Sequence, residues 1–446
     1  MSPRLSRRQA ERRGLRLWHV GLVLTLAFTT ALLVASTVFY AGWELLGARE
    51  LKPERRLDSK TLFDLVKLSF GVVAGAGALV ALIVAYRRQR VDEDGALRDA
   101  TRLHTERFTT AVSQLGSESA AVQLGGVHSL AGLADDAPTR ELRQTGIDVL
   151  CAYLRLPHTT EADLTAGDTE AHRAYLAFRE VRHTVIRVIR DRLRLPPQHR
   201  HSWQGHDFDF TGVAFDGGDF SGSTFSGANV SFFGATFAGS IIDFNKATFK
   251  DSTVDFTGAT FTCDFVNFRE ATFSGGTVDF TKATFNGHTV SFSSATFSGS
   301  VVRFSSATFT GSTVSFHGTL FSDGEIYFDA ATFTSTELYF TGAGFYGGRL
   351  AFSEATMASD TTSFVGAIFD SGVINFHTAA FPIGSRVTFA LARFRGATVR
   401  FHPSAFAGAE VDFSQSDGSP PRGVVPPDGC PTPAGLRLPI SWLVTP

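Results

Sequence analysis

Side chains able to do chemistry are sparse in this chain of 446 residues. The three cysteines, Cys151, Cys263 and Cys430, lie too far apart for a metal or redox motif. Five histidines stand singly, without paired carboxylates or cysteines at ligand spacing: His206, His288, His317, His377 and His402. No phosphate-binding loop, nucleotide fingerprint or hydrolase elbow occurs. We therefore expect no enzyme activity, no cofactor, no metal and no small-molecule substrate.

Acidic residues recur at one position of a repeated pattern, directly before a phenylalanine. Four of them are Asp219, Asp243, Asp255 and Asp279. If equivalent positions stack, these carboxylates would form an acidic stripe, which Asn267, Ser291 and Arg303 would interrupt. We expect an acidic patch there rather than a catalytic pair.

The element that would position such side chains is a phenylalanine ladder. From Phe256 to Phe376 a phenylalanine recurs at every twelfth residue, and a second series runs five residues behind it, with Met357 at one place. So strict a period over about half the chain predicts a solenoid built by stacking one small unit. The residues predicted to form its core are Phe256, Phe261, Phe268, Phe273, Phe280, Phe285, Phe292, Phe297, Phe304, Phe309, Phe316, Phe321, Phe328, Phe333 and Phe340.

Each unit consists of two short extended segments joined by corners. In Val254-Asp255-Phe256 the apolar residue and the phenylalanine lie two apart and point to the same side, while Asp255 points outward. Gly, Ser, Thr and Asp in the connections favour turns. One unit could close a flattened 12-residue coil, or two units could close a four-sided 24-residue coil. We favour the coil of two units, because two phenylalanine rings would crowd the narrow interior of the smaller one.

The runs Phe210-Thr-Gly-Val-Ala-Phe215 and Asp219-Phe220-Ser-Gly-Ser-Thr-Phe225 resemble the pentapeptide-repeat family. That resemblance implies a right-handed quadrilateral β-helix, with the phenylalanine and the small residue two before it facing inward. From Phe232 onward this chain departs from five-residue spacing to alternating steps of five and seven. Three further runs resemble bacterial membrane-anchored members of that family, in which a helical block precedes the repeats: 144–155, 182–190 and 202–212.

Two uncharged apolar runs predict transmembrane helices at 20–43 and 68–86, so that residues 1–91 form a basic tail and an anchor. At ~1.5 Å per residue, a helix over the first run spans the ~30 Å hydrocarbon core with some tilt. The first run is too long for a secretory signal peptide. In the second run, Gly71 and Gly75 form a G-x-x-x-G that would let two helices pack closely, although glycine is common in membrane helices whether or not they pair.

The outer flanks of the two apolar runs are more basic than the loop between them. Residues 1–19 carry six arginines and the segment after the second run carries five, against six Lys and Arg in the connecting loop. The positive-inside rule therefore predicts a multi-pass protein of the cell membrane with both termini cytoplasmic. Arg87, Arg88 and Arg90 would then lie beside lipid headgroups.

Residues 92–200 lack the phenylalanine period and instead show the 3.6-residue period of helices. This pattern predicts a small all-α module. Two helix faces are apolar: Val127, Leu130, Ala131 and Ala134, and Ile147, Leu150, Cys151 and Leu154. Cys151 is accordingly expected in the core rather than as a nucleophile. The last helix, about 169–195, carries seven arginines. These predict a solvated face or, alternatively, a surface for anionic lipid or nucleic acid.

The repeat region is expected at 203–413. Its step from Phe381 to Phe389 is one residue too long, which predicts a bulge. Residues 414–446 are rich in Pro, Gly and Ser and are expected to be disordered. Within them, 436–442 would suit a lid on the last coil, which otherwise presents an open edge.

The expected protein is thus a two-helix transmembrane hairpin, a small all-α module and a right-handed β-helix. We interpret it as a non-enzymatic, membrane-tethered scaffold that presents its solenoid to a cytoplasmic protein partner. The alternative is mimicry of DNA, as in soluble pentapeptide-repeat proteins that shield gyrase. Such mimicry needs a dense acidic surface, whereas residues 203–413 carry a net charge of only −9. Nucleic acid is therefore not an expected partner.

Overall fold

The computed structural model describes residues 58–158, 167–286, 289–359, 361–402, 409–421 and 431–443, together with several residues between 25 and 44 and a few short groups elsewhere. The chain divides into two compact units, Met1–Thr101 and Arg102–Pro446, which are described separately.

Helix α2, Ser59–Leu115, provides most of the described residues of the first unit, and its last turns belong to the second. Within the described residues, its section Ser59–Glu93 alone is long and apolar enough to cross a membrane, judged by length and composition. The predicted span 68–86 lies in that section, and α2 continues beyond it without a break. The other predicted span, 20–43, lies mostly outside the described residues, so the hairpin stays a prediction.

Three further helices form the all-α module of the second unit: α3 (Ala120–Asp135), α4 (Arg140–Arg155) and α5 (Thr169–Leu193). The side chains predicted to form the two apolar helix faces are all buried, Cys151 among them. Helix α3 packs closely against the end of α2 at Gly126. A Cβ added to Gly126 would come within 2.6 Å of the backbone nitrogen of Leu115.

Two sheets of short parallel strands follow the helices and form the solenoid. The first has 16 strands: β1 (Phe208–Asp209), β3 (Thr224–Ser226), β4 (Asn229–Ser231), β6 (Thr248–Lys250), β7 (Thr253–Asp255), β10 (Thr272–Ser274), β11 (Thr277–Asp279), β14 (Thr296–Ser298), β15 (Val301–Arg303), β18 (Leu320–Ser322), β19 (Glu325–Tyr327), β22 (Gly344–Ala351), β25 (Ile368–Phe376), β27 (Arg393–Phe394), β28 (Thr398–Phe401) and β30 (Asp417–Gly418), as far as the structure describes the chain. The second, within the same residues, has 15: β2 (Ala214–Asp219), β5 (Thr236–Asp243), β8 (Thr260–Phe261), β9 (Phe265–Asn267), β12 (Thr284–Phe285), β13 (Thr289–Ser291), β16 (Thr308–Thr310), β17 (Thr313–Ser315), β20 (Thr332–Thr334), β21 (Glu337–Tyr339), β23 (Thr356–Ala358), β24 (Thr361–Ser363), β26 (Ser385–Thr388), β29 (Ala409–Asp412) and β31 (Leu436–Arg437).

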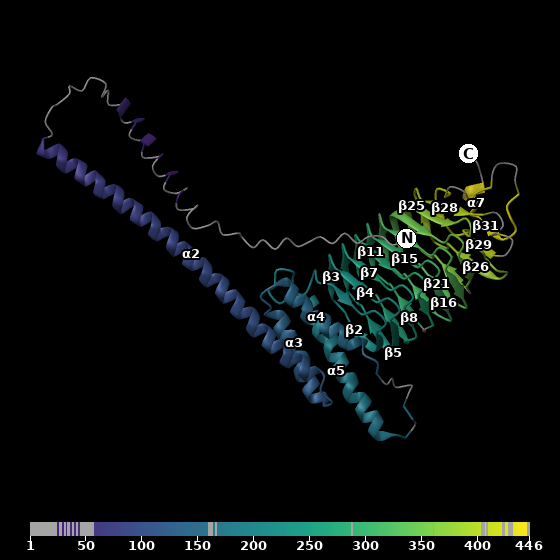
Figure 1. Cartoon of the computed structure of the whole chain (residues 1–446). Helices are drawn as coiled ribbons and strands as arrows, with labels where there is room; N and C mark the ends of the chain where they lie inside the picture. The colour runs from purple at the N-terminus through teal and green to yellow at the C-terminus, as the bar shows by residue number, and fades with distance from the viewer. Residues whose placement is uncertain are drawn as a thin grey trace, which may run out of the picture. The chain divides into compact units, whose positions relative to one another are not determined.

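One coil of the solenoid takes two units of the ladder. Thr272 pairs with Thr248 in the coil before it and with Thr296 in the coil after it. Each sheet contains two columns of strands, joined where a long strand such as β22 turns a corner, so that every coil has four sides. The predicted 24-residue coil is confirmed. The solenoid is a parallel β-helix of the right-handed type with about nine turns (Figure 1).

Phenylalanine rings fill the interior in columns that run along the solenoid. All 15 predicted core phenylalanines are buried. Phe280 stacks on Phe256 and on Phe304, with ring centroids 4.6 and 4.8 Å apart and planes within 5° of parallel. This distance follows from the ~4.8 Å spacing of paired strands. Rings of neighbouring columns meet edge to face, as Phe268 and Phe280 do at 6.0 Å, which is a favoured aromatic geometry.

A tight turn closes the corner that follows many of these rings. The carbonyl of Phe256 accepts a hydrogen bond from the backbone nitrogen of Ala259 (3.0 Å), and Gly258 between them has a φ of 67°. These features define a type II turn, whose third residue needs a positive φ. At equivalent corners Lys282 and Leu391, each with a φ of 59°, occupy that position. A side chain there costs about 1–2 kcal/mol of backbone strain, which stacking of the coils must offset.

The coil step changes where the sequence predicts a bulge. Thr362 in β24 pairs with Val387 in β26, which lies one position further along the chain than the regular step would place it. The extra residue is taken up in a turn in which the nitrogen of Ser385 donates to the carbonyl of Pro382 (3.1 Å). The predicted bulge between Phe381 and Phe389 is therefore confirmed.

The C-terminal residues close the last coil. The expected disorder of 414–446 is wrong for its described parts, because β30 and β31 pair with the preceding coil and helix α7 (Ile440–Leu443) follows them. Trp442 packs on Phe394 and Phe413, with ring centroids 5.7 Å from each. Burial of apolar side chains on an open stack of rings outweighs the flexible composition around them, and the predicted lid is confirmed.

Candidate functional site

The polar side chains of the second unit gather where α5 lies against the first coil of the solenoid. Arginines of α5 and of the residue after it reach that coil: Arg179 pairs with Asp216 (3.0 Å), Arg190 pairs with Asp219, and Arg194 donates to the carbonyl of Ser221 (2.6 Å). Charge-assisted hydrogen bonds of this kind are stronger than neutral ones. They attach the all-α module to the start of the β-helix.

Arg182 is the most deeply buried of these arginines, with 2% of its surface exposed. It donates to the carbonyls of Leu154 (2.8 Å) and Ala214 (2.6 Å), and burial lowers its pKa. These contacts with the coil were not among the expectations for this helix, although Arg187 stays 50% exposed, and contact with lipid or nucleic acid stays a prediction. The contacts arise because several arginines lie on the side of α5 that faces the coil, which the count of arginines alone does not indicate.

Asp216 is the centre of a polar cluster under α5. Its carboxylate accepts a hydrogen bond from the Tyr175 hydroxyl (2.8 Å) and lies 3.2 Å from His183 Nε2 and 3.0 Å from Arg179 Nε. Burial alone would raise the pKa of Asp216, but the hydrogen bonds from His183 and Tyr175 and the nearby charge of Arg179 lower it overall. A carboxylate with a lowered pKa is a poor general base, so this cluster suits attachment of the helix rather than catalysis.

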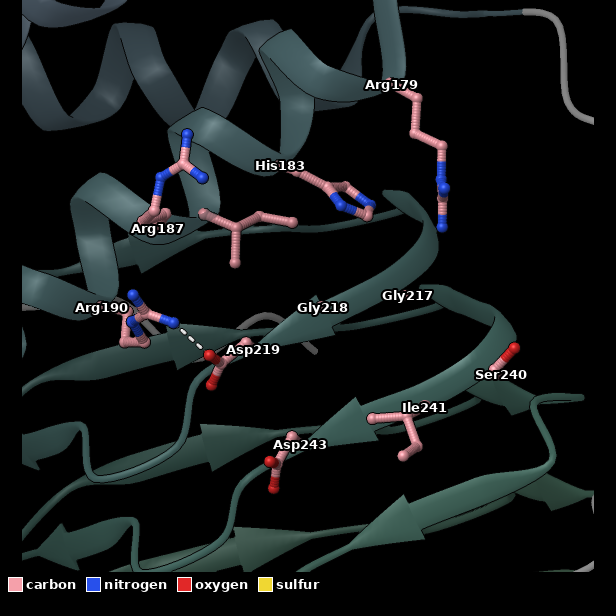
Figure 2. A pocket seen from close by; sticks show the side chains of 11 residues that line it. Arg179, His183, Arg187, Arg190, Gly217, Gly218, Asp219, Ser240, Ile241 and Asp243 are labelled. Carbon is pink, nitrogen blue, oxygen red and sulfur yellow. Dashed lines mark hydrogen bonds and ion pairs between the residues drawn. The ribbon is translucent and has the colours of Figure 1, made fainter. Parts of the chain in front are cut away.

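Beside this cluster an open cleft of about 490 Å³ lies between α5 and the strands β2 and β5 (Figure 2). Its helical wall consists of Arg179, His183, Ile186, Arg187 and Arg190. Its strand wall consists of Gly217, Gly218, Asp219, Ser240, Ile241 and Asp243. Figure 2 shows Arg190 of the helix reaching Asp219 on the strands, whereas the guanidinium of Arg187 points away from the strands. The helical wall therefore carries basic side chains and the strand wall two carboxylates, of which Asp219 is already paired with Arg190.

Asp243 differs from Asp219 in lacking an arginine partner among the described residues. Its Oδ1 accepts hydrogen bonds from the backbone nitrogen of Asn245 (2.8 Å) and from Asn267 Nδ2 (2.9 Å). Burial, and secondly the charge of Asp219, raise the pKa of Asp243. The cleft thus places Asp243, which has no ion pair among the described residues, next to the paired Arg190 and Asp219.

The four carboxylates predicted to form one stripe lie in two different columns. Asp219 pairs with Asp243, and Asp255 pairs with Asp279. Because two units make one coil, successive units of the ladder lie on opposite sides of it, and the prediction of a single stripe is wrong. Each of the four accepts a hydrogen bond from the backbone nitrogen two residues later, at 2.8–2.9 Å, and thereby supports a turn.

The histidines and cysteines are placed mainly by packing. His206 is buried, and His377 and His402 lie on successive coils with ring centroids 5.3 Å apart. Burial raises the pKa of Cys151 to about 12 and that of Cys263 to about 11, so that both thiols stay protonated. Of the remaining predicted residues, His317 lies at a described corner, whereas His288 and Cys430 are outside the described residues. In the part of the chain that the structure describes, no group of three or more His, Cys, Asp and Glu side chains could hold a metal ion.

The residues predicted for membrane contacts lie on α2. A Cβ added to Gly71 or Gly75 would meet no described atom within 4 Å, so close helix packing at these positions stays a prediction. Arg90 Nε donates to the hydroxyl of Tyr86 at 3.1 Å, and its guanidinium lies 5.5 Å from the centre of that ring. Contact of Arg87, Arg88 and Arg90 with lipid likewise stays a prediction.

The cleft itself is a feature that the sequence did not indicate as a site. Its strand wall contains the pair Gly217-Gly218, but Gly-Gly pairs recur at 275–276 and 347–348, so the local sequence does not mark the cleft. Gly217 has a φ of 93°, and a Cβ there would come within 3.8 Å of the His183 ring. Comparison of the chain with protein-family models, with curated proteins and with solved structures finds no match.

Proposed function

We propose that this protein is a non-enzymatic, membrane-tethered scaffold of the pentapeptide-repeat type, whose β-solenoid binds a cytoplasmic protein. The observation that carries the proposal is the regular outer surface of the solenoid. On one column the outward threonines Thr260, Thr284, Thr308 and Thr332 are Cα partners from coil to coil. Such a surface offers hydroxyl groups at the ~4.8 Å spacing of paired strands over many coils.

The rigidity of the solenoid supports a binding role. Stacked rings such as Phe280 and Phe304 fix the interior, and each coil is hydrogen bonded to the next through its backbone, as Phe280 N is to Arg303 O at 2.6 Å. A surface that is already ordered loses little conformational entropy when a partner binds. Repeat proteins use extended surfaces of this kind for recognition.

Membrane attachment is the second part of the proposal. The apolar section Ser59–Glu93 supports one membrane span, and Arg87, Arg88 and Arg90 follow its most apolar part. We place a second span at 20–43 and both termini in the cytoplasm, on the arginine and lysine counts of the flanks. Anionic headgroups would then attract the three arginines by about 1 kcal/mol each.

The arrangement of charges gives less support to DNA mimicry. The aspartates that would form the acidic stripe lie on opposite sides of the coil, and Asp219 and Asp216 already pair with arginines of α5. Later coils add ion pairs with basic residues, such as Arg386 with Glu410 at 3.5 Å. Duplex DNA carries a charge about every 1.7 Å of its axis, a density that this surface does not approach.

The proposal is tested by proximity labelling in intact cells with a biotin ligase fused after Pro446. The control carries the same ligase after Thr101, at the boundary of the first unit, and lacks the solenoid. We expect a short, reproducible set of cytoplasmic or membrane proteins that the full chain labels and the control does not. Identical sets would contradict a role of the solenoid in binding. Labelling of extracytoplasmic proteins would reverse the proposed orientation, and recovery of gyrase would favour DNA mimicry.

A further inference from the structure

Two histidines lie on successive coils at the same corner of the solenoid. Phe376 and Phe401 are Cα partners whose rings stack at 4.9 Å, and the residue after each is an exposed histidine, His377 or His402. The backbone nitrogen of His377 donates to Oδ1 of Asn375 at 3.2 Å, which fixes the turn that carries this side chain. The two imidazoles are therefore held next to each other by the regular pairing of the coils.

The distance between the two rings suits a shared metal ion. Their centroids lie 5.3 Å apart, with the ring planes at 68°. At the ~2.0–2.1 Å metal–nitrogen distance of zinc sites, two imidazoles at a tetrahedral angle have their ring centres about 5 Å apart. Each imidazole has two nitrogens and a metal ion takes only one of them, so another interaction of either ring does not prevent binding.

Another pair of histidines, His199 and His201, shows that separation alone does not define a metal site. Its ring centroids are also 5.3 Å apart, with the planes at 75°. However, His201 Nε2 accepts a hydrogen bond from Arg200 Nε at 2.6 Å, and His199 Nδ1 accepts one from the backbone nitrogen of His201 at 3.1 Å. The guanidinium beside His201 would repel a cation. This pair is therefore a matched control for the one on the solenoid.

We propose that His377 and His402 together bind one divalent transition-metal ion of the zinc class. Imidazole is a ligand that suits zinc, copper and nickel. Two protein ligands leave the other coordination positions to water, which agrees with the lack of any group of three or more His, Cys, Asp and Glu ligands among the described residues. Arg400 precedes His402 by two residues, but its side chain is exposed, so water weakens its repulsion of the ion. The site is independent of the scaffold role and departs from the expectation that the protein takes no metal.

The test is equilibrium dialysis of zinc against the full chain embedded in lipid nanodiscs, with empty nanodiscs as the blank. Copper(II), which zinc should displace, then serves as a spectroscopic probe, and electron spin echo envelope modulation counts the imidazoles bound to it. We expect saturable zinc binding and two imidazoles on the copper ion. No zinc binding above the blank at millimolar concentration, or a copper ion with a single imidazole, would overturn the proposal.

Variants then assign the two ligands. His377→Ala and His402→Ala are each expected to weaken zinc binding by at least about tenfold, because either change leaves a single ligand where two linked ligands acted together. The control is His199→Ala, which removes one ring of the other pair. Unchanged binding by both solenoid variants, or equal weakening by the control, would place the site elsewhere and overturn the proposal. Thermal unfolding of each variant shows that it is folded, and the imidazole count on copper stands without any variant.

Discussion

At the scale of the residue, His206 lies between the all-α module and the solenoid, and its environment makes the stability of the folded chain depend on pH. The ring is buried, and its Nδ1 lies 3.0 Å from Gln144 Oε1 on α4. Burial, and after it the charges of Arg140 and Arg143, lower the pKa of His206 to about 4, against Asp207, which acts in the opposite direction. The folded chain therefore holds this histidine neutral.

We predict that the folded state loses stability as the pH falls from about 6.5 to about 4. In that window the unfolded chain binds a proton at His206 and the folded chain does not, so that protonation favours unfolding. The measurement is the urea midpoint of the chain at a series of pH values. His206→Gln, which cannot titrate, should show a shallower decrease across the same window. An identical decrease in both proteins would mean that other groups, such as the carboxylates paired with α5, account for the pH dependence.

The role of a residue could be predicted from the sequence where the repeat period sets its position. It could not be predicted where a tertiary contact sets the role. The inward position of every ladder phenylalanine was predictable, because an extended chain alternates its side chains. Asp255 and Asp219 occupy the same place in the repeat, yet only Asp219 meets an arginine. That difference depends on which coil α5 covers. The sequence around each aspartate does not indicate which coil this is.

At the scale of the element, the column of stacked rings is the unit of stability. Phe304 is 1% exposed and stacks on Phe280 and Phe328 at 4.8 Å, with Phe292 edge-on at 5.9 Å. Each ring is covered by the coil before it and the coil after it. Removal of one ring therefore exposes two neighbours, and stability is cooperative along the column.

We predict that Phe304→Ala destabilises the solenoid by about 3–5 kcal/mol through the cavity that it leaves. Phe304→Asp should unfold several coils, because a carboxylate cannot be solvated between stacked rings. Limited proteolysis followed by mass spectrometry would locate the unfolded coils around residue 304. The control is Thr310→Asp, which adds the same charge at an exposed position near the same coil corner. Cleavage in the control that matches Phe304→Asp would show that added charge, not the dry interior, is responsible.

The elements of the solenoid were more predictable than those that close it. The spacing of five and seven residues indicated corners, and the surplus residue before Phe389 indicated the bulge, because each coil must match its neighbour. The composition of 414–446 suggested disorder, but Trp442 and Leu436 are buried on the last coil. Composition averages over a segment, whereas a lid needs only a few apolar side chains in the right place.

At the scale of the whole second unit, the two ends of the solenoid are closed by different means. At the C-terminal end Trp442 covers the last rings and donates its Nε1 to the carbonyl of Gly418 at 2.8 Å. At the other end Trp203 is fully buried and donates to Asp135 at the end of α3 (2.9 Å). A parallel β-helix without such covers would present unpaired backbone groups and exposed rings.

This closure predicts which truncations fold. A chain of residues 102–446 keeps the part of α2 that packs on the module, where His104 Nε2 lies 3.0 Å from the carbonyl of Leu133, and it should be soluble and melt cooperatively. A chain of residues 203–446 loses α5 and its arginine contacts, which leaves Phe208 and Phe210 on an open first coil, so it should aggregate or unfold its first coils. Circular dichroism and size-exclusion chromatography of the two fragments make the comparison. An unfolded longer fragment would mean that the solenoid depends on the first unit. A shorter fragment that is equally stable would show that α5 binds the first coil without being needed to close it.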